Sequence, residues 1–480
     1  MKTSILKVML LLLTFGGIIA CSDDDSESKI PGPKGMYISP EKLDFDAVGG
    51  PSIINVHVLN DADWTLSTPA DWLTINQTTG SGVTFNISIY VAPNDSEQER
   101  STTILLTSGS ETRNLEIHQA GKTPEPVFTY DVAPDPSNMG DLNSVQFAAQ
   151  MHAGWNLGNS LEAIGGETAW GNPMVTKQLI DAVKAAGFDT VRIPVSWSNF
   201  SDATNFTISE AWLNRVEEVV NYALDNNMYV IMNEHWDGGW MQPTNAQKDY
   251  VNNRLAVMWK QIATRFRNYD YHLIFAGTNE VMVEGNYNTP TAEYYNAQNS
   301  FNQTFVTTVR ATGGRNAYRY LAVQSFNTNI DYADSFAVIP TDVTPNRILM
   351  EVHYYDPYNF TLNENSTITQ WGSIATDPNA TETWANESYV DTEFQKMKTK
   401  FIDNGIGVLL GEYGAIVRED VAGSETFRIH YLNYVSNSAR THGIVPVYWD
   451  NGFIGNHTMA LFNRNTGAVL YPDVLEAIMP

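Results

Sequence analysis

The chain has 480 residues, which is too long for one ordinary domain and suits two or three. Hydrophobic residues make up 43% of it and aromatic residues 11%, which is enough for a globular core. The formal net charge of −26 excludes nucleic acid and anionic membrane surfaces as expected partners, because both repel an acidic chain. A neutral polyhydroxylated ligand that stacks on aromatic rings remains compatible with this composition.

The first 20 residues are typical of a secretory signal. Lys2 and Lys7 precede an apolar run that is too short for a stable membrane span. Cys21 is the only cysteine, and its place after "GIIA" resembles the lipobox of bacterial lipoproteins. This resemblance implies that Cys21 carries the lipid, that disulfides are absent, and that the chain meets the membrane only through this anchor.

Residues 21–35 are acidic and rich in serine, proline and glycine, so they are predicted to form a flexible tether. The acidic run after the cysteine is similar to the export signal of Bacteroidetes surface lipoproteins. The expected location is therefore the outer face of the cell outer membrane.

Residues 36–121 read as short β-rich runs of period two, separated by turns such as "VGGP" and "TTGSG". About seven such runs predict a small all-β sandwich. The segment resembles the BACON domain, an immunoglobulin-like module, through Trp64, Asp71–Leu73, the Gly80/Gly82 turn and the closing "QAG". Trp64 and Trp72 are expected in the core rather than on a sugar-binding face.

Residues 122–139 contain four prolines, which predicts a semi-rigid hinge.

From 140 to 480 apolar runs alternate with amphipathic segments, which favours a parallel sheet buried on both faces. Eight such units predict a (β/α)8 TIM barrel. An open doubly wound sheet is the rival, but "GWNLGNS" is a poor phosphate-binding turn. The predicted strands are 151–157, 188–194, 228–234, 272–279, 319–325, 347–354, 406–411 and 443–449.

Polar side chains lie at the carboxyl ends of these strands, where a barrel places its active site. Glu280 follows the fourth strand and Glu412 the seventh. Other polar or aromatic residues share this end: Asn159, Arg192, His235, Asn279, His353, Tyr355 and Trp449. Trp170 and Trp240, in loops after the first and third strands, are expected to be platforms in the cleft, whereas Glu234, Glu284 and Glu351 are expected to have structural or surface roles.

Two carboxyl groups in one cleft favour hydrolysis of a glycosidic bond. One carboxyl group must be protonated so that it can give a proton to the departing glycosidic oxygen. The other must be ionised so that it can attack the sugar or activate a water molecule. Two like charges close together disfavour double ionisation, which suits this division of labour. Their separation would distinguish retaining from inverting chemistry, and the sequence does not give it.

The motifs "GFDTVRIPVSW", "LIFAGTNE", "EVHYYDPY", "GEYGA" and "PVYWDNG" resemble glycoside hydrolase family 5, over residues 140–480. "HAGWNLGNSLEA" with "GETAWGNP" is similar to its fourth subfamily, which acts on β-1,4-glucans and often on xyloglucan. The resemblance implies that Glu412 is the nucleophile and Glu280 the acid/base of a retaining enzyme. It also implies that Asn279 holds the sugar 2-hydroxyl and that Trp449 is the floor beneath the attacked sugar.

By the same resemblance, Arg192 and Tyr355 lie beside Glu412, and His235 and His353 line the central subsite. The family usually has proline after its Asn–Glu pair, whereas this chain has Val281, so a slight change in loop shape is expected with catalysis retained. The histidines show no tight metal-binding spacing, so neither a metal nor another cofactor is expected. The chain is expected to act as a monomer.

The expected substrate is a plant β-glucan, xyloglucan first, cleaved at internal linkages. Mixed-linkage glucan, cellulose and mannan are alternatives within the same chemistry. An alternative of another class is a non-catalytic glycan-binding surface lipoprotein, which would have no need of both glutamates.

Overall fold

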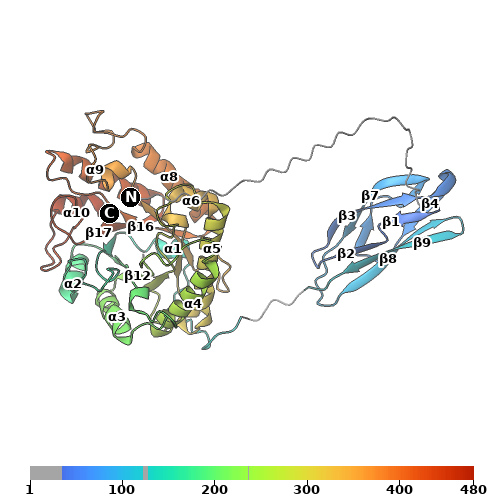
Figure 1. The fold of residues 1–480 in the computed structure, drawn as a ribbon, viewed down its shortest axis with the longest axis horizontal. Helices are drawn as coiled ribbons and strands as arrows, with labels where there is room; N and C mark the ends of the chain where they lie inside the picture. Colours follow the sequence, from blue (N-terminus) through green and yellow to red (C-terminus); the bar gives the residue numbers. More distant parts are fainter. Residues whose placement is uncertain (1–34, 123–127, 236) are drawn as a thin grey trace, which may run out of the picture. The chain divides into compact units, whose positions relative to one another are not determined.

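The structure is a computed structural model that describes residues 35–122, 128–235 and 237–480. The predicted signal peptide (1–20), the lipidation site Cys21 and the tether up to residue 34 lie outside the described residues. The chain divides between Val127 and Phe128 into two compact units, each considered by itself below (Figure 1).

The first unit is a sandwich of two β-sheets, with strand orders β1-β3-β7-β5 and β2-β9-β8-β4-β6. Trp64 is 1% exposed in the core between them, and Trp72 packs against that core beneath the Arg100 guanidinium, so both are core residues as expected. The run "YISPEKLDF" is not one strand: it divides at Pro40, which lacks a backbone N–H, between the two sheets. The strands are β1 (Tyr37–Ser39), β2 (Lys42–Phe45), β3 (Gly50–His57), β4 (Asp63–Ser67), β5 (Leu73–Ile75), β6 (Thr79–Ser81), β7 (Val83–Val91), β8 (Arg100–Ser108) and β9 (Glu111–Gln119).

The second unit is a closed barrel of parallel strands in chain order, from β10 to β17. Closure is direct, because β10 pairs with β17 in the register Trp155↔Tyr448. The predicted TIM barrel is therefore confirmed, and the open doubly wound sheet is excluded. The strands are β10 (Gly154–Leu157), β11 (Thr190–Ile193), β12 (Tyr229–Asn233), β13 (Leu273–Ala276), β14 (Leu321–Gln324), β15 (Ile348–Tyr354), β16 (Gly407–Tyr413) and β17 (Ile444–Asp450).

Helices surround the barrel, each burying one face against it (Figure 1). In α2 the Thr176 hydroxyl caps the first turn by accepting from the Leu179 N–H, and Leu179, Ile180 and Val183 form the buried face. The helices are α1 (Ser144–Ala148), α2 (Lys177–Ala185), α3 (Glu210–Leu224), α4 (Lys248–Arg265), α5 (Ala292–Ala311), α6 (Ile330–Phe336), α7 (Tyr358–Thr361), α8 (Glu387–Lys400), α9 (Ser424–Thr441) and α10 (Pro472–Ile478).

The lower interior of the barrel is apolar. Helix α1 packs against its amino-terminal end, with the Phe147 ring stacked 3.6 Å from Tyr320. Side chains from the strands fill the space above this ring pair, among them Ile231, Ile274, Ala322, Leu349, Leu409 and Val447. This packed layer is the support on which the polar end of the barrel rests.

The second half of the predicted hinge belongs to the barrel unit. The Asp131 N–H donates to the carbonyl of Ala311, and the Asp135 N–H donates to that of Gly314. These backbone bonds fix the segment against the end of α5, so the proline-rich character of residues 131–136 does not make them a free linker.

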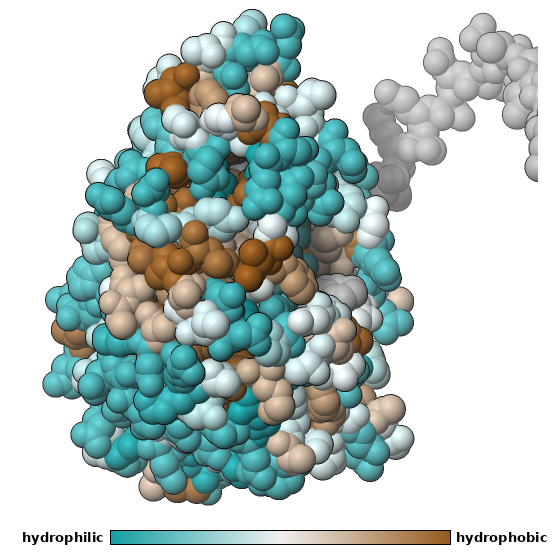
Figure 2. Space-filling view, turned by 90° about the vertical axis from the view of Figure 1, so that its left-hand side faces the viewer, coloured by the Kyte–Doolittle hydropathy of each residue, from teal (hydrophilic) through white to brown (hydrophobic). Residues whose placement is uncertain are grey.

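The face shown in Figure 2 is mainly hydrophilic, with a short band of hydrophobic residues across it. Among the residues that the structure describes, no helix has the length and apolar character needed to cross a lipid bilayer.

Candidate active site

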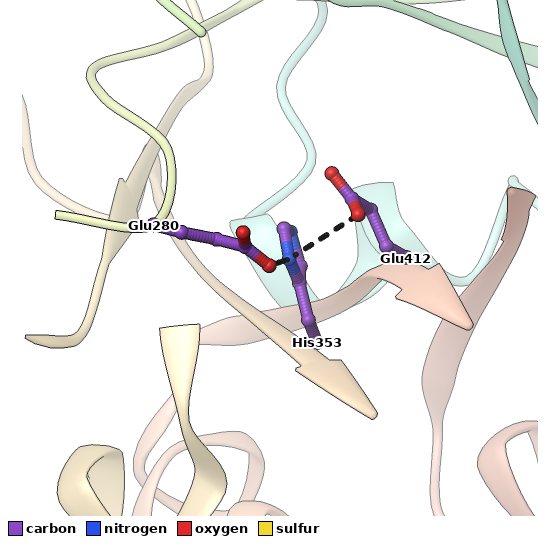
Figure 3. A group of neighbouring side chains, drawn as sticks. All are labelled: Glu280, His353 and Glu412. Atoms are coloured by element: carbon purple, nitrogen blue, oxygen red, sulfur yellow. Dashed lines mark hydrogen bonds and ion pairs between the residues drawn. The ribbon is translucent and has the colours of Figure 1, made fainter. Parts of the chain in front are cut away.

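Glu280 and Glu412 face each other at the carboxyl end of the barrel (Figure 3). Glu412 lies within β16, and Glu280 lies in the loop after β13. One carboxylate oxygen of each lies within 4.8 Å of the other. This spacing resembles the roughly 5–5.5 Å of retaining glycosidases and is too short for the water that inverting enzymes hold at about 6.5–9.5 Å. We call these two residues the glutamate pair.

His353, on β15, lies between the two carboxylates (Figure 3). Its Nδ1 is 2.8 Å from Oε1 of Glu280 and 3.6 Å from Oε2 of Glu412. Burial alone would lower the pKa of His353, but the surrounding carboxylates outweigh it and raise the pKa to about 9. The imidazole is therefore a cation at neutral pH, and its Nδ1–H donates to Glu280.

Arg192, on β11, connects several of the predicted residues beneath the pair. Its Nη1 donates to Oε1 of Glu412 at 2.9 Å, and its Nη2 donates to Oδ1 of Asn279 at 2.7 Å. The Tyr355 hydroxyl donates to the other Glu412 oxygen at 3.1 Å. Burial raises the pKa of Glu412, whereas the charges of His353 and Arg192 act in the opposite direction and favour the ionised carboxylate.

Asn279 has a free donor aimed at the site. Its Oδ1 is taken by Arg192, and its buried Nδ2 has no hydrogen-bond partner among the described residues. A buried unpaired donor carries a penalty of about 1–3 kcal/mol, which a ligand hydroxyl would remove. The side chain is therefore prepared to hold an acceptor oxygen next to the glutamate pair.

His235 is held in one tautomer by Asn233 at the end of β12. The Asn233 Nδ2 donates to Nδ1 of His235 at 3.0 Å. Burial, Arg192 and His353 lower the pKa of His235 well below its usual range, so the ring is neutral. Its proton therefore sits on Nε2, which makes the free edge of the ring a hydrogen-bond donor.

Trp449, near the end of β17, presents a partly exposed ring. It lies parallel to the His235 ring, with 5.9 Å between centroids and 10° between planes. Gly158 lies against the indole, because a Cβ at position 158 would come within 2.9 Å of Cζ2. The Trp449 indole therefore packs directly on the backbone of Gly158, where a side chain would displace it.

The remaining predicted residues stand outside this network. Asn159 adopts a left-handed conformation (φ 55°), and its carbonyl accepts from Nδ2 of Asn172 at 2.9 Å. Trp170 is 38% exposed in the loop after β10. Trp240 lines a cavity of about 470 Å³ beside Glu280, but the Arg254 guanidinium lies 4.4 Å from its ring centroid. Trp240 is therefore partly a structural residue.

The loop carrying Glu280 differs from the family pattern in a way the structure explains. The Val281 N–H donates to the Asn279 carbonyl at 3.0 Å, and the Val281 carbonyl accepts from Asn327 at 2.9 Å. Proline could not make the first bond because it has no N–H. In this chain the turn is therefore held by a hydrogen bond that a proline at position 281 would lack.

Sequence reasoning missed one carboxylate in this network. Glu351, expected to be structural or at the surface, is fully buried with Oε1 2.8 Å from Nε of Arg192. Its spacing of two residues from His353 was the available signal, because alternate residues of a strand share a face. Glu234, by contrast, is buried apart from the pair, and burial next to Asp237 raises its pKa well above the usual range.

Comparison with known proteins gives the family of each unit. Residues 156–455 match the model described as cellulase (glycosyl hydrolase family 5), and residues 62–120 match the BACON model, described as a putative N-terminal binding domain.

Individual relatives extend over most of the chain. A xyloglucan-specific endo-β-1,4-glucanase of Bacteroides ovatus is 40% identical over 98% of this chain and 95% of its own length. The structure of a Bacteroides ovatus GH5 xyloglucanase with a heptasaccharide superposes with a TM-score of 0.70, covering 92% of this chain and 99% of that one, at 40% identity. A family 5 xyloglucanase from Paenibacillus pabuli is 43% identical with a TM-score of 0.67, over 69% of this chain and 99% of that chain.

Proposed function

Because this chain belongs to glycosyl hydrolase family 5, we propose that it is an endo-acting enzyme that hydrolyses the β-1,4-glucan backbone of xyloglucan with retention of configuration. The observation that carries the proposal is the spacing of the glutamate pair, in which one carboxylate oxygen of Glu280 lies within 4.8 Å of one of Glu412. The relatives described above are named as xyloglucanases, and one of them is similar to this chain over both units. These names support xyloglucan as the substrate.

In the first half-reaction Glu412 attacks the anomeric carbon while Glu280 gives its proton to the departing glycosidic oxygen. The carbon–oxygen bond breaks as the bond to Glu412 forms. Arg192 and Tyr355 hold the two Glu412 oxygens, which fixes the direction of attack.

In the second half-reaction Glu280, now ionised, accepts a proton from water, and the water oxygen displaces Glu412 from the sugar. The Nδ1–H of His353 donates to Oε1 of Glu280 at 2.8 Å and holds that carboxyl group in position between the two steps. Asn279 Nδ2 would hold the 2-hydroxyl of the same sugar, a contact that strengthens as the transition state forms.

The cavity beside Glu280 suits the sugar that leaves. Its wall includes Trp240, Met282, Glu284 and the strongly exposed Tyr287. An acid must lie next to the oxygen it protonates, so the sugar on the far side of that oxygen lies near this cavity. Trp449, in β17, and Trp170, in the loop after β10, would then stack on the sugars that stay bound to Glu412.

The test is to incubate the purified protein with xyloglucan, carboxymethylcellulose, mixed-linkage glucan, mannan and xylan, and to measure new reducing ends. Xyloglucan is expected to be cut fastest, into long fragments first, and proton NMR is expected to show the β-anomer as the first product. Faster release from mannan or from unbranched glucan would change the substrate, and release from none would refute the activity.

We also propose that Cys21 carries a lipid that holds the enzyme on the outer face of the outer membrane. The apolar leader, the "GIIA" before Cys21 and the acidic tether support this location. In cells, wild-type protein is expected in the membrane fraction and accessible to added protease, and Cys21→Ala is expected to remove lipid labelling. Labelling of that variant with palmitate would contradict the proposal.

A further inference from the structure

We propose that Glu351 is a positioning residue for the reaction, whose buried charge holds Arg192 and His353 against the glutamate pair. It touches neither Glu280 nor Glu412 directly, and it acts through the two cations that do. The inference rests on the proposed function, and it adds a third carboxylate to the machinery of the site.

Both oxygens of Glu351 have polar neighbours, and its contact with Nε of Arg192 is a close ion pair rather than a well-directed hydrogen bond. Oε1 lies 2.8 Å from Nε of Arg192 and 3.4 Å from Nε2 of His353. Oε2 accepts from Nε2 of Gln324, on the neighbouring strand β14, at 2.7 Å. The side chain is completely shielded from solvent, so these charges act without screening by water.

Each cation uses its opposite side to hold one of the glutamate pair. Arg192 faces Glu351 through Nε and Glu412 through Nη1, at 2.9 Å. His353 faces Glu351 through Nε2 and Glu280 through Nδ1. Loss of the Glu351 charge would therefore release both cations at once, on the side away from the substrate.

The charge of Glu351 is the one that stays constant during turnover. Glu412 loses its charge when it becomes an ester with the sugar, and Glu280 gains one when it gives up its proton. Arg192 and His353 would lose part of their hold at each step if the glutamate pair were their only counterions. A third carboxylate that takes no part in bond making keeps both cations in place through both half-reactions.

The protonation states agree with this role. Burial alone would raise the pKa of Glu351, but Arg192 and His353 outweigh it and lower the pKa to about 2, so the residue remains ionised. The other titratable groups around His353 are the glutamate pair, Arg192 and the neutral His235. Of the three carboxylates near His353, only Glu351 faces Nε2.

The backbone makes room for this side chain at Gly411. A Cβ at position 411 would lie 2.1 Å from Oε1 of Glu351, closer than any real contact. The pairing of β15 with β16 shifts at this place: Val352 lies opposite Leu410 and His353 opposite Glu412, so Gly411 is passed over. The strand irregularity therefore brings Glu412 level with His353 and leaves space for Glu351 beneath them.

The decisive experiment is Glu351→Gln in the full chain, assayed on xyloglucan across pH. We expect kcat to fall at least about tenfold with little change in KM, since the substrate contacts remain. We also expect the alkaline limb of kcat/KM to move about one unit towards neutral, because the acid Glu280 is hydrogen-bonded to His353, whose pKa falls when it loses a neighbouring negative charge. An unmoved alkaline limb would overturn the proposal even if kcat fell.

A matched control is Asp342→Asn. Asp342 is a buried carboxylate paired with Arg310 at 2.7 Å, and neither residue is hydrogen-bonded to the glutamate pair or its partners. It is expected to lower the unfolding midpoint without moving the pH limb. Glu351→Asp retains the charge and is expected to keep the limb near its wild-type position.

Two further measurements keep the test decisive if Glu351→Gln folds poorly or the substrate is wrong. Gly411→Ala pushes Oε1 away without removing it, and a smaller shift in the same direction is expected. NMR titration of labelled His353 needs no substrate: its pKa should fall in Glu351→Gln and, by a smaller amount, in Gly411→Ala. An unchanged His353 titration would refute the positioning role, whereas failure of the proposed function would show as wild-type inactivity on every glycan.

Discussion

The lower and upper parts of the barrel interior are equally buried, but they are built from opposite kinds of side chain. On β12, β14 and β15 an apolar residue gives way to a polar one two positions later. The pairs are Ile231 and Asn233, Ala322 and Gln324, and Leu349 and Glu351, all fully buried. Residues two apart on a strand share a face, so each pair forms adjacent levels of one interior. The lower level supplies packing, and the upper level supplies the charges that orient the glutamate pair.

This difference teaches that burial alone does not identify a core residue. An unpaired charge in the upper level would be strongly unfavourable, and there Glu351 and Glu412 are matched by the cations Arg192 and His353. Substitutions in the two levels should therefore separate stability from activity.

The largest effect is expected for Glu412→Gln, which removes the nucleophile from the upper level. Turnover on xyloglucan should fall by about four orders of magnitude or more, because the amide cannot form the glycosyl ester. Binding of the polysaccharide, measured by affinity electrophoresis, should remain. Wild-type rates of reducing-end release would show that the residue has another role.

The loss of hydrolysis rate in Glu280→Gln should depend on the leaving group of the substrate. Hydrolysis of polysaccharide should fall by about 10²–10⁴-fold, since the departing sugar needs a proton. Aryl glycosides with acidic phenols need no such help, so formation of their glycosyl-enzyme should be slowed far less. Equal losses on both substrates, measured by stopped-flow release of the phenol, would contradict the acid role.

Leu349→Ala tests the lower level. Removing the buried side chain should lower the free energy of unfolding by about 2–5 kcal/mol. Urea titration measures that change, and kcat at 25 °C should stay within about twofold of wild type. A large loss of kcat with intact structure would mean that the lower level also tunes the site.

The His353 cation links the upper level to pH. Its pKa rises on folding from an ordinary 6.5 to about 9, so its contribution to stability is complete below pH 6.5 and is lost as pH rises through about 9. Unfolding midpoints of wild type should therefore fall over this window more than those of His353→Asn. Parallel curves for the two proteins would contradict the shift.

The smallest effect is expected from removal of residues 36–121. The glutamate pair and its partners all lie in the barrel unit, so rates on soluble oligosaccharides should change less than about twofold. Reducing-end assays on the shortened chain provide the measurement. A large loss would show that the sandwich contributes to substrate binding in solution.

The sequence predicted the barrel and the residues at its mouth because both leave local signals. Apolar runs of strand length ended on Glu, Asn or His, and the topology brought those ends together. Glu351 left a weaker signal, since it lies inside a strand, and its partner Arg192 is distant in sequence. Separation of the glutamate pair depends on strand register, which single residues do not reveal.

The absent side chain at Gly411 has an evolutionary consequence. Alanine there would crowd Oε1 of Glu351, so the acid could stay only by moving its flexible end away from Arg192 and His353. A lineage that shortens Glu351 first displaces nothing when a Cβ appears at 411, whereas the reverse order shifts the acid at once. Among related chains, a Cβ at 411 should therefore occur mainly beside a shorter residue at 351.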